Sequence, residues 1–124
     1  MGNMHKMRVW QDAKLLATQI YHITNNNAFA KDYSFRDQLR RSAISVPSNL
    51  AEGEESLFPK VSIKFFSVAS ASLAELRTQI EIARDISYLE ESKYLEISNA
   101  TEVLAKRIKK LIQYRYNQLK YPSP

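Results

Sequence analysis

The segment LRRSAISVPSNLAEG, residues 39–53, decides the fold because it combines a helical pattern of apolar residues with a proline. Its apolar residues recur at spacings of four, three and four, which puts them on one helical face: Leu39, Ala43, Val46, Leu50. Pro47 lies inside this pattern and lacks the N–H that would donate to the carbonyl of Ala43. We therefore predict a helix that bends at Pro47 and stops at Gly53.

Length and composition restrict the classes of protein that this chain can belong to. The chain has 124 residues, 44% of them hydrophobic and 25% charged, so we expect one domain over residues 1–124. Two glycines and four prolines leave few of the turns that an all-β fold needs. The absence of cysteine excludes disulfides and thiolate chemistry and indicates a reducing, cytoplasmic location. No segment is long and apolar enough to cross a membrane, so no membrane partner is expected.

The same spacing rule predicts three more helices. The four predicted helices cover the following approximate ranges: 8–24, 35–53, 59–88 and 92–117. Ser34 and Ser92 are the predicted N-caps of the second and fourth helices, and Pro59 suits the first turn of the third. The tail from Tyr116 to Pro124 is expected to fray. Four amphipathic helices with short connections predict an all-α fold, an antiparallel up-down-up-down four-helix bundle.

A second line of polar residues runs along the helix predicted at 35–53. It lies about 200° round the helix axis from the apolar line and consists of Arg41, Ser45, Ser48 and Glu52. Serine is a weak helix former, so its use here needs a reason. Either small side chains let the backbone of another subunit approach closely, or the serines compensate for the hydrogen bond lost at Pro47. Both interpretations stay open.

The helix predicted at 59–88 also carries a second line beside its core stripe: Phe65, Val68, Ser72, Glu75, Gln79, Ile82, Ile86. Its apolar surface is wider than one bundle buries, which predicts a homo-oligomer. We expect a structural polar network in that interface, with Arg40 or Arg41 paired to Glu75: Arg40, Arg41, Ser45, Ser48, Glu52, Glu75, Gln79. Paired charges in helical assemblies set register and partner choice, so a catalytic role is not expected.

The net charge of +5 is concentrated near the C-terminus. Residues 1–100 hold 12 basic and 12 acidic residues, whereas residues 101–124 hold one acid against six bases: Lys106, Arg107, Lys109, Lys110, Arg115, Lys120. Clustered bases attract the phosphates of nucleic acid, and Tyr114, Tyr116 and Tyr121 are available for base stacking. The alternative is a solvated face whose lysines stabilise the C-terminus of the helix. Two hypotheses follow, an RNA-binding protein or a protein-binding scaffold.

Patterns for catalysis, cofactors and metals are missing from the sequence. A di-iron bundle needs Glu-x-x-His pairs, and neither His5 nor His22 belongs to one. A glycine-rich phosphate loop is excluded by the low glycine content. The serines lie in no recognisable motif with a histidine. We therefore expect no enzyme activity, no catalytic residue, no cofactor and no bound metal.

Three segments resemble a known family: VWQDA at 9–13, QLRRSAISVPSNLAEG at 38–53 and FFSVASASLAELRTQIEIARDISYL at 65–89. The chain resembles the four-helix-bundle proteins encoded in intervening sequences of 23S ribosomal RNA genes, also called the S23 ribosomal protein family. The resemblance implies an up-down bundle that assembles as a homopentamer. It also implies kinship in fold with accessory proteins of diversity-generating retroelements, basic pentamers that bind nucleic acid and a reverse transcriptase. It carries over no catalytic residue.

The chain departs from that family in two places. The family places glycine and basic residues after Ala-Glu-Gly, but this chain has Glu54, Glu55, Ser56 and Leu57. An anionic ligand is therefore not expected at this loop. The family also often has glycine in the third helix and in the turn after it, where this chain has Ala71 and Ser87.

Overall fold

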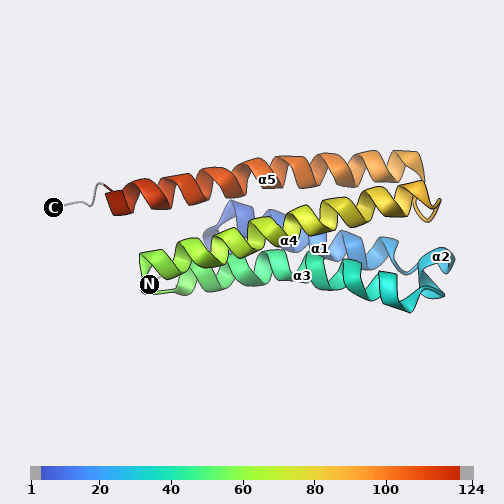
Figure 1. Cartoon of the computed structure of the whole chain (residues 1–124), viewed down its shortest axis with the longest axis horizontal. Helices are drawn as coiled ribbons and strands as arrows, with labels where there is room; N and C mark the ends of the chain where they lie inside the picture. Colours follow the sequence, from blue (N-terminus) through green and yellow to red (C-terminus); the bar gives the residue numbers. More distant parts are fainter. Residues whose placement is uncertain (1–3, 121–124) are drawn as a thin grey trace.

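The computed structural model describes residues 4–120. All of the secondary-structure elements in this range are helices. A short 3₁₀ helix, η1 (Met4–Lys6), precedes the long helices α1 (Arg8–Ile23), α3 (Tyr33–Glu55), α4 (Pro59–Asp85) and α5 (Glu91–Lys120). One further short helix, α2 (Asn27–Ala30), lies between α1 and α3. Consecutive long helices run in opposite directions (Figure 1). The predicted all-α, up-down-up-down four-helix bundle is therefore confirmed.

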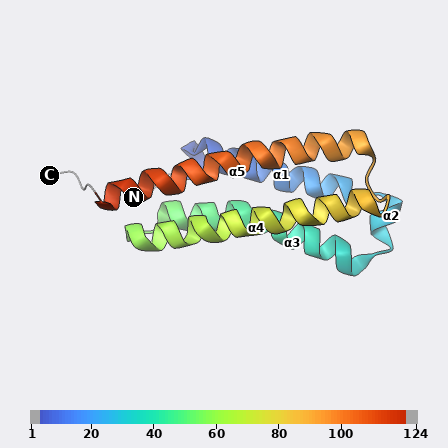
Figure 2. The same cartoon turned by 45° about the horizontal axis from the view of Figure 1, so that its top comes forward.

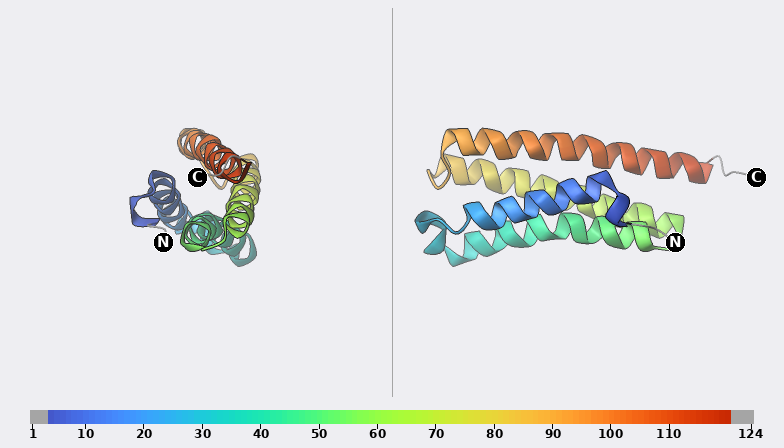
Figure 3. Two further views of the ribbon diagram at one scale, coloured as in Figure 1. Left: turned by 90° about the vertical axis from the view of Figure 1, so that its left-hand side faces the viewer. Right: turned by 180° about the vertical axis from the view of Figure 1, so that it is seen from behind.

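The four long helices surround one core in the order α1, α3, α4, α5 (Figure 3, left). Figure 2 shows the same pairing from another angle, with α3 beside α4 and α5 above them. The apolar stripes predicted from spacing face this core, and their central residues are less than 2% exposed: Leu39, Ala43, Val46, Leu50, Phe66, Ala69, Leu73, Leu76, Ile80, Ala83. Burial of these side chains supplies most of the stabilisation of the bundle. Within residues 4–120, no helix has the length and apolarity needed to span a membrane.

The connection between α1 and α3 differs from the prediction. Ser34 does not cap α3; the side chain of Asp32 accepts a hydrogen bond from the backbone N–H of Phe35 (3.2 Å) instead. The short helix α2 was not predicted, because four residues are too few to show a helical period. Its Phe29 is fully buried and packs edge-on against the ring of Tyr88, 5.2 Å between centroids. The α1–α3 connection thus seals one end of the core.

Tyr88 ties the turn after α4 to the start of α3. Its Oη donates a hydrogen bond to Oδ2 of Asp32 over 3.0 Å. This hydrogen bond raises the pKa of the Tyr88 phenol above its ordinary value. The contact holds the α4–α5 turn against the α1–α3 connection at the same end of the bundle.

The ends of three helices differ from the approximate predicted ranges by two or three residues, and α4 ends at Asp85 rather than at residue 88. α3 continues past Gly53 to Glu55, and α5 begins at Glu91, so Ser92 lies inside its first turn. α5 is helical up to Lys120, beyond the predicted end at residue 117. Residues 121–124, including Tyr121, lie outside the described part of the chain.

Gly53 is needed for the close contact between α3 and α4 rather than for a helix stop. It is buried, and a Cβ atom at this position would lie 2.5 Å from Cε1 of Phe66 and 3.0 Å from the carbonyl oxygen of Ser62. Phe66 is itself fully buried and has no open space into which it can shift. Glycine therefore lets the two helices approach more closely than alanine would.

We expect Gly53→Ala to lower the free energy of unfolding by about 1–3 kcal/mol through overpacking, despite the better helix propensity of alanine. Urea unfolding at a fixed protein concentration measures the loss. Phe66→Leu shortens the opposing ring, so in the Gly53→Ala background it should cost less than it does alone. Equal costs in both backgrounds would contradict the proposed clash.

Ser87 holds the left-handed position that ends α4. Its φ is 65°, and the N–H of Tyr88 donates to the carbonyl of Ala83 (2.8 Å) while the N–H of Ser87 donates to that of Arg84 (2.9 Å). These two bonds form a Schellman motif, in which glycine is preferred because it has no Cβ penalty. Serine therefore retains backbone strain at this turn.

Ser87→Gly should raise the free energy of unfolding by about 0.5–1 kcal/mol, because the relief of left-handed strain exceeds the entropy lost to the more flexible unfolded chain. Thermal unfolding followed by circular dichroism measures the gain. Ser87→Ala is the control and should leave the melting temperature close to that of the wild type. A Ser87→Gly protein that melts lower than wild type would contradict this account.

Candidate functional site

Small polar side chains line the contact between α3 and α4 inside a single chain. Oγ of Ser42 donates to Oε1 of Gln79 (2.6 Å), and the hydroxyls of Ser45 and Ser72 share a hydrogen bond of 2.7 Å. Nε2 of Gln79 also donates to Oε1 of Glu75 (3.3 Å). Gln79 is only 6% exposed, so these bonds satisfy a buried amide. We call these five residues the α3–α4 polar seam.

The polar seam changes the interpretation of the predicted second line on α3. Ser45 lies against α4 of the same chain and also accepts a hydrogen bond from Nδ2 of Asn49 (3.0 Å). Arg41, Ser48 and Glu52 are exposed. The predicted line is thus divided, because Ser45 packs within the bundle while the other residues face solvent.

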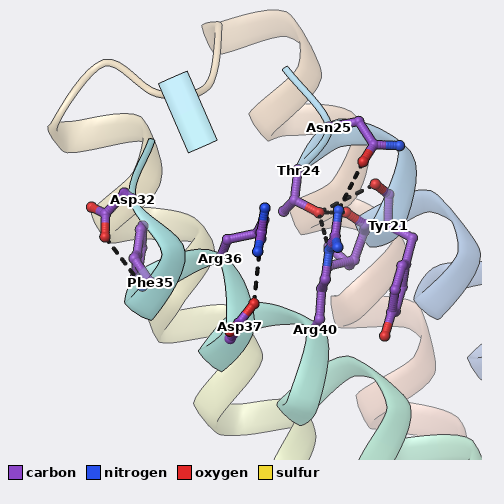
Figure 4. Close-up of polar contacts among 9 residues, drawn as sticks. Tyr21, Thr24, Asn25, Asp32, Phe35, Arg36, Asp37 and Arg40 are labelled. Atoms are coloured by element: carbon purple, nitrogen blue, oxygen red, sulfur yellow. Dashed lines mark hydrogen bonds and ion pairs between the residues drawn. The ribbon is translucent and has the colours of Figure 1, made fainter. Parts of the chain in front are cut away.

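Within one chain, Arg40 bonds residues at the end of α1 rather than Glu75, which is its predicted partner in the interface between subunits. Figure 4 shows its side chain reaching the end of α1, where Nε donates to Oγ1 of Thr24 (2.8 Å) and Nη2 donates to Oδ1 of Asn25 (2.9 Å). Its guanidinium also lies over the ring of Tyr21, 4.6 Å from the centroid. Arg40 therefore fixes α3 to the C-terminus of α1, and it does not pair with Glu75.

Two of the six C-terminal bases hold α5 to other helices. Arg115 bonds both carboxylate oxygens of Glu54 on α3, at 2.6 and 2.9 Å, and its side chain is 23% exposed. Arg107 bonds Oδ2 of Asp12 on α1. Both arginines are therefore paired with carboxylates of other helices, although the side chain of Arg107 is still 42% exposed.

The remaining four bases stay on the outer side of α5. Lys109 and Lys110 are exposed and have no ion-pair partner among residues 4–120. Lys106 pairs with Oε1 of Glu102 at 3.6 Å, an exposed contact one helical turn apart that contributes little stability. Lys120 lies exposed at the end of α5.

A groove along the α4–α5 contact is lined by two of these lysines and by Arg77, a residue that the sequence analysis did not identify as a candidate site residue. The groove has a volume of about 380 Å³ and is lined by Ser70, Leu73, Ala74, Arg77, Glu102, Ala105, Lys106 and Lys109. Arg77 of α4 is exposed and has no ion-pair partner among residues 4–120. The residues next to Arg77 in the sequence do not indicate that it lies near the lysines. Only the packing of α4 against α5 places it there. We call this space the α4–α5 groove.

Exposed aromatic side chains lie near the C-terminal end of α5. Tyr114 is 61% exposed and Tyr116 is 60% exposed. The last turns of α5 project beyond the α3–α4 end of the bundle (Figure 1). The predicted stacking residues are thus accessible in part, with Tyr121 outside the described residues.

The outer side of α4 carries exposed apolar side chains. Val68, Ile82 and Ile86 are 41%, 44% and 47% exposed, and all three belong to the second line predicted on this helix. The centre of that line is polar, with Glu75 exposed and Ser72 turned towards α3. These three exposed apolar side chains lie towards the two ends of the line, with its polar centre between them, and we call them the apolar strip of α4.

Comparisons with known proteins identify the family. The family model for the 23S rRNA-intervening sequence protein matches residues 5–110. Among solved structures, a protein of unknown function from the S23 ribosomal protein family of Bacteroides thetaiotaomicron has a similar fold, with a TM-score of 0.78 and 21% identity. The similarity covers 84% of this chain and 97% of that one. A search of curated proteins found no match. Because the family model spans most of the sequence, the chain belongs to the 23S rRNA-intervening sequence protein family.

Proposed function

We propose that this protein is a non-enzymatic homo-oligomer that binds RNA through the outer, basic face of α5 and acts in the cytoplasm. The observation that carries the proposal is the pair of exposed lysines, Lys109 and Lys110, which have no carboxylate partner among residues 4–120. Such lysines can neutralise phosphates and release the cations that are condensed on a nucleic acid. Exposed Tyr114 and Tyr116 on the same helix add surfaces for base stacking.

The oligomer is supported by exposed apolar side chains on α4 and by charged side chains on α3 that have no ion-pair partner among residues 4–120. Val68, Ile82 and Ile86 of α4 are partly exposed to water in one chain. Arg41 and Glu52 of α3 have no ion-pair partner among residues 4–120. A second copy would cover the apolar strip and supply opposite charges, with Arg41 paired to Glu75 or Glu52 across subunits. The number of five subunits comes from the family resemblance.

An oligomer also strengthens the proposed binding to RNA. One basic face makes few phosphate contacts, and so its affinity is low at physiological salt. Several copies in one closed assembly present the same face repeatedly, so that contacts along one RNA strand add through effective concentration. The proposal therefore links assembly to binding.

Reversing three lysines of α5, Lys106→Glu, Lys109→Glu and Lys110→Glu, should abolish retention of RNA at 0.15 M salt. Each lost phosphate contact removes about 0.7 from the slope of log affinity against log salt for a single strand, so the slope should fall by about 2. Electrophoretic mobility shift at several salt concentrations measures both effects.

The matched control reverses three exposed lysines elsewhere, Lys14, Lys31 and Lys60, which changes the net charge equally. This variant should keep most of its RNA binding. Equal loss in both triple variants would attribute binding to bulk charge, and unchanged binding in the α5 variant would favour the alternative function, a protein-binding scaffold.

Light scattering on the purified protein should give a mass several times the 14.3 kDa of one chain. Val68→Glu together with Ile82→Glu should lower that mass, because the two charges would be buried in the interface. Leu95→Glu is the control, since Leu95 is 56% exposed on α5, away from the apolar strip of α4. A wild-type monomer at micromolar concentration would overturn the proposed assembly.

A further inference from the structure

The α4–α5 groove has the composition of an anion site. Arg77, Lys106 and Lys109 project into it from two helices, and Glu102 is the one acid in its lining. Ser70 adds a hydroxyl donor, and two alanines in the lining, Ala74 and Ala105, have small side chains that leave space for a ligand. The lining therefore has an excess of positive charge in a concave surface, which focuses attraction on negative ligands.

The dimensions of the groove restrict the ligand. Its lining runs from Ser70 to Arg77 on α4 and from Glu102 to Lys109 on α5, which is about 10 Å along each helix. A flexible single strand can follow this straight path with consecutive phosphates, whereas the backbone of a stiff duplex is held to its own helical path. The planar guanidinium of Arg77 is suited to phosphate because its N–H groups donate to two oxygens at once.

We propose that the α4–α5 groove binds consecutive phosphates of single-stranded RNA, with Arg77 and Lys109 as the principal contacts. This inference rests on the proposed function and specifies both the strandedness of the RNA and the path of its backbone. The RNA follows the contact between the two helices, so α4 takes part in binding although its own sequence is nearly neutral. Bases directed away from the groove remain free to stack.

Glu102 limits the affinity of this site. Its carboxylate pairs with Nζ of Lys106 at 3.6 Å, in the same groove that a phosphate would enter. A phosphate that bonds Lys106 must displace this carboxylate and then lies close to a like charge. Removal of the charge on Glu102 should therefore strengthen binding more than removal of an acid outside the groove.

The groove and the proposed subunit interface use different sides of α4. Arg77 and Ile82 are five residues apart, which places them about 140° from each other round the helix axis. Assembly through Val68, Ile82 and Ile86 thus leaves Arg77 accessible. Loss of binding in an Arg77 variant can be measured without loss of the oligomer.

The experiment measures fluorescence anisotropy of a labelled 20-nucleotide oligouridylate with the full-length protein in 0.15 M salt. Arg77→Gln should weaken binding about fourfold, the factor given by one fewer phosphate contact at this salt concentration, and lower the salt slope by about 0.7. Glu102→Gln should strengthen binding by a similar factor. The controls are Arg8→Gln and Glu96→Gln, which make the same charge changes at exposed positions outside the groove and should alter binding less.

Ligand identity is tested with the same proteins. Duplex RNA of mixed sequence should bind more weakly than the single strand and should be insensitive to Arg77→Gln. ATP at matched ionic strength should compete poorly, because one nucleotide lacks the continuing backbone. Displacement of the oligonucleotide by micromolar ATP would indicate a nucleotide pocket and overturn the assignment to RNA.

The outcomes separate this inference from the proposed function. If the triple lysine variant loses binding while Arg77→Gln and Glu102→Gln match their controls, RNA binds the outer face of α5 and the groove assignment is wrong. If the wild-type protein retains no oligonucleotide, both proposals fall. Opposite shifts in the two groove variants, with unchanged oligomer mass, support the groove.

Discussion

The close contact between α3 and α4 is the constraint on which the rest of the structure depends. Gly53 lets the ring of Phe66 lie against the backbone of α3, and the hydroxyls of Ser45 and Ser72 meet further along the same contact. Larger residues at these positions would hold the two helices apart. Because α4 also packs against α5, the position of α4 determines which residues of the two helices share the α4–α5 groove.

Charged residues have two separate uses in this bundle. Arg40, Arg107 and Arg115 each hold one helix to another through hydrogen bonds in fixed geometry. Lys106, Lys109 and Lys110 of α5 are exposed, and the one ion pair that they form within residues 4–120, between Lys106 and Glu102, is an exposed and weak contact. Arginine suits the first use because its planar group bonds in a defined direction, whereas lysine is a strongly hydrated point charge. Accessible positive charge therefore comes from these lysines together with exposed arginines such as Arg41 and Arg77.

Sequence periodicity predicted the long helices and their buried faces because burial depends on which residues share one side of a helix. The stripe from Phe66 to Ala83 is buried as expected. The helix ends were predicted less well, since Asp32 and Ser34 are both plausible caps and only the path of the chain selects Asp32. The sequence predicts a helix stop at Gly53, because glycine is common at helix ends. Its actual contact is with Phe66 of another helix, and the sequence does not show that these two segments are adjacent.

The sequence by itself determined the fold class, the position of the core and the concentration of bases near the C-terminus, since each depends on residue type and local spacing. Only the tertiary structure decided which bases are bonded and which are accessible. The neighbouring residues in the sequence do not show that Arg107 and Arg115 form ion pairs while Lys109 does not. Their partners, Asp12 and Glu54, come from helices that are distant in the sequence. Arg77 likewise lines one groove with Lys106 and Lys109 only because α4 packs against α5. The attraction of such a site for an anion depends on distances in space and not on separation in the sequence.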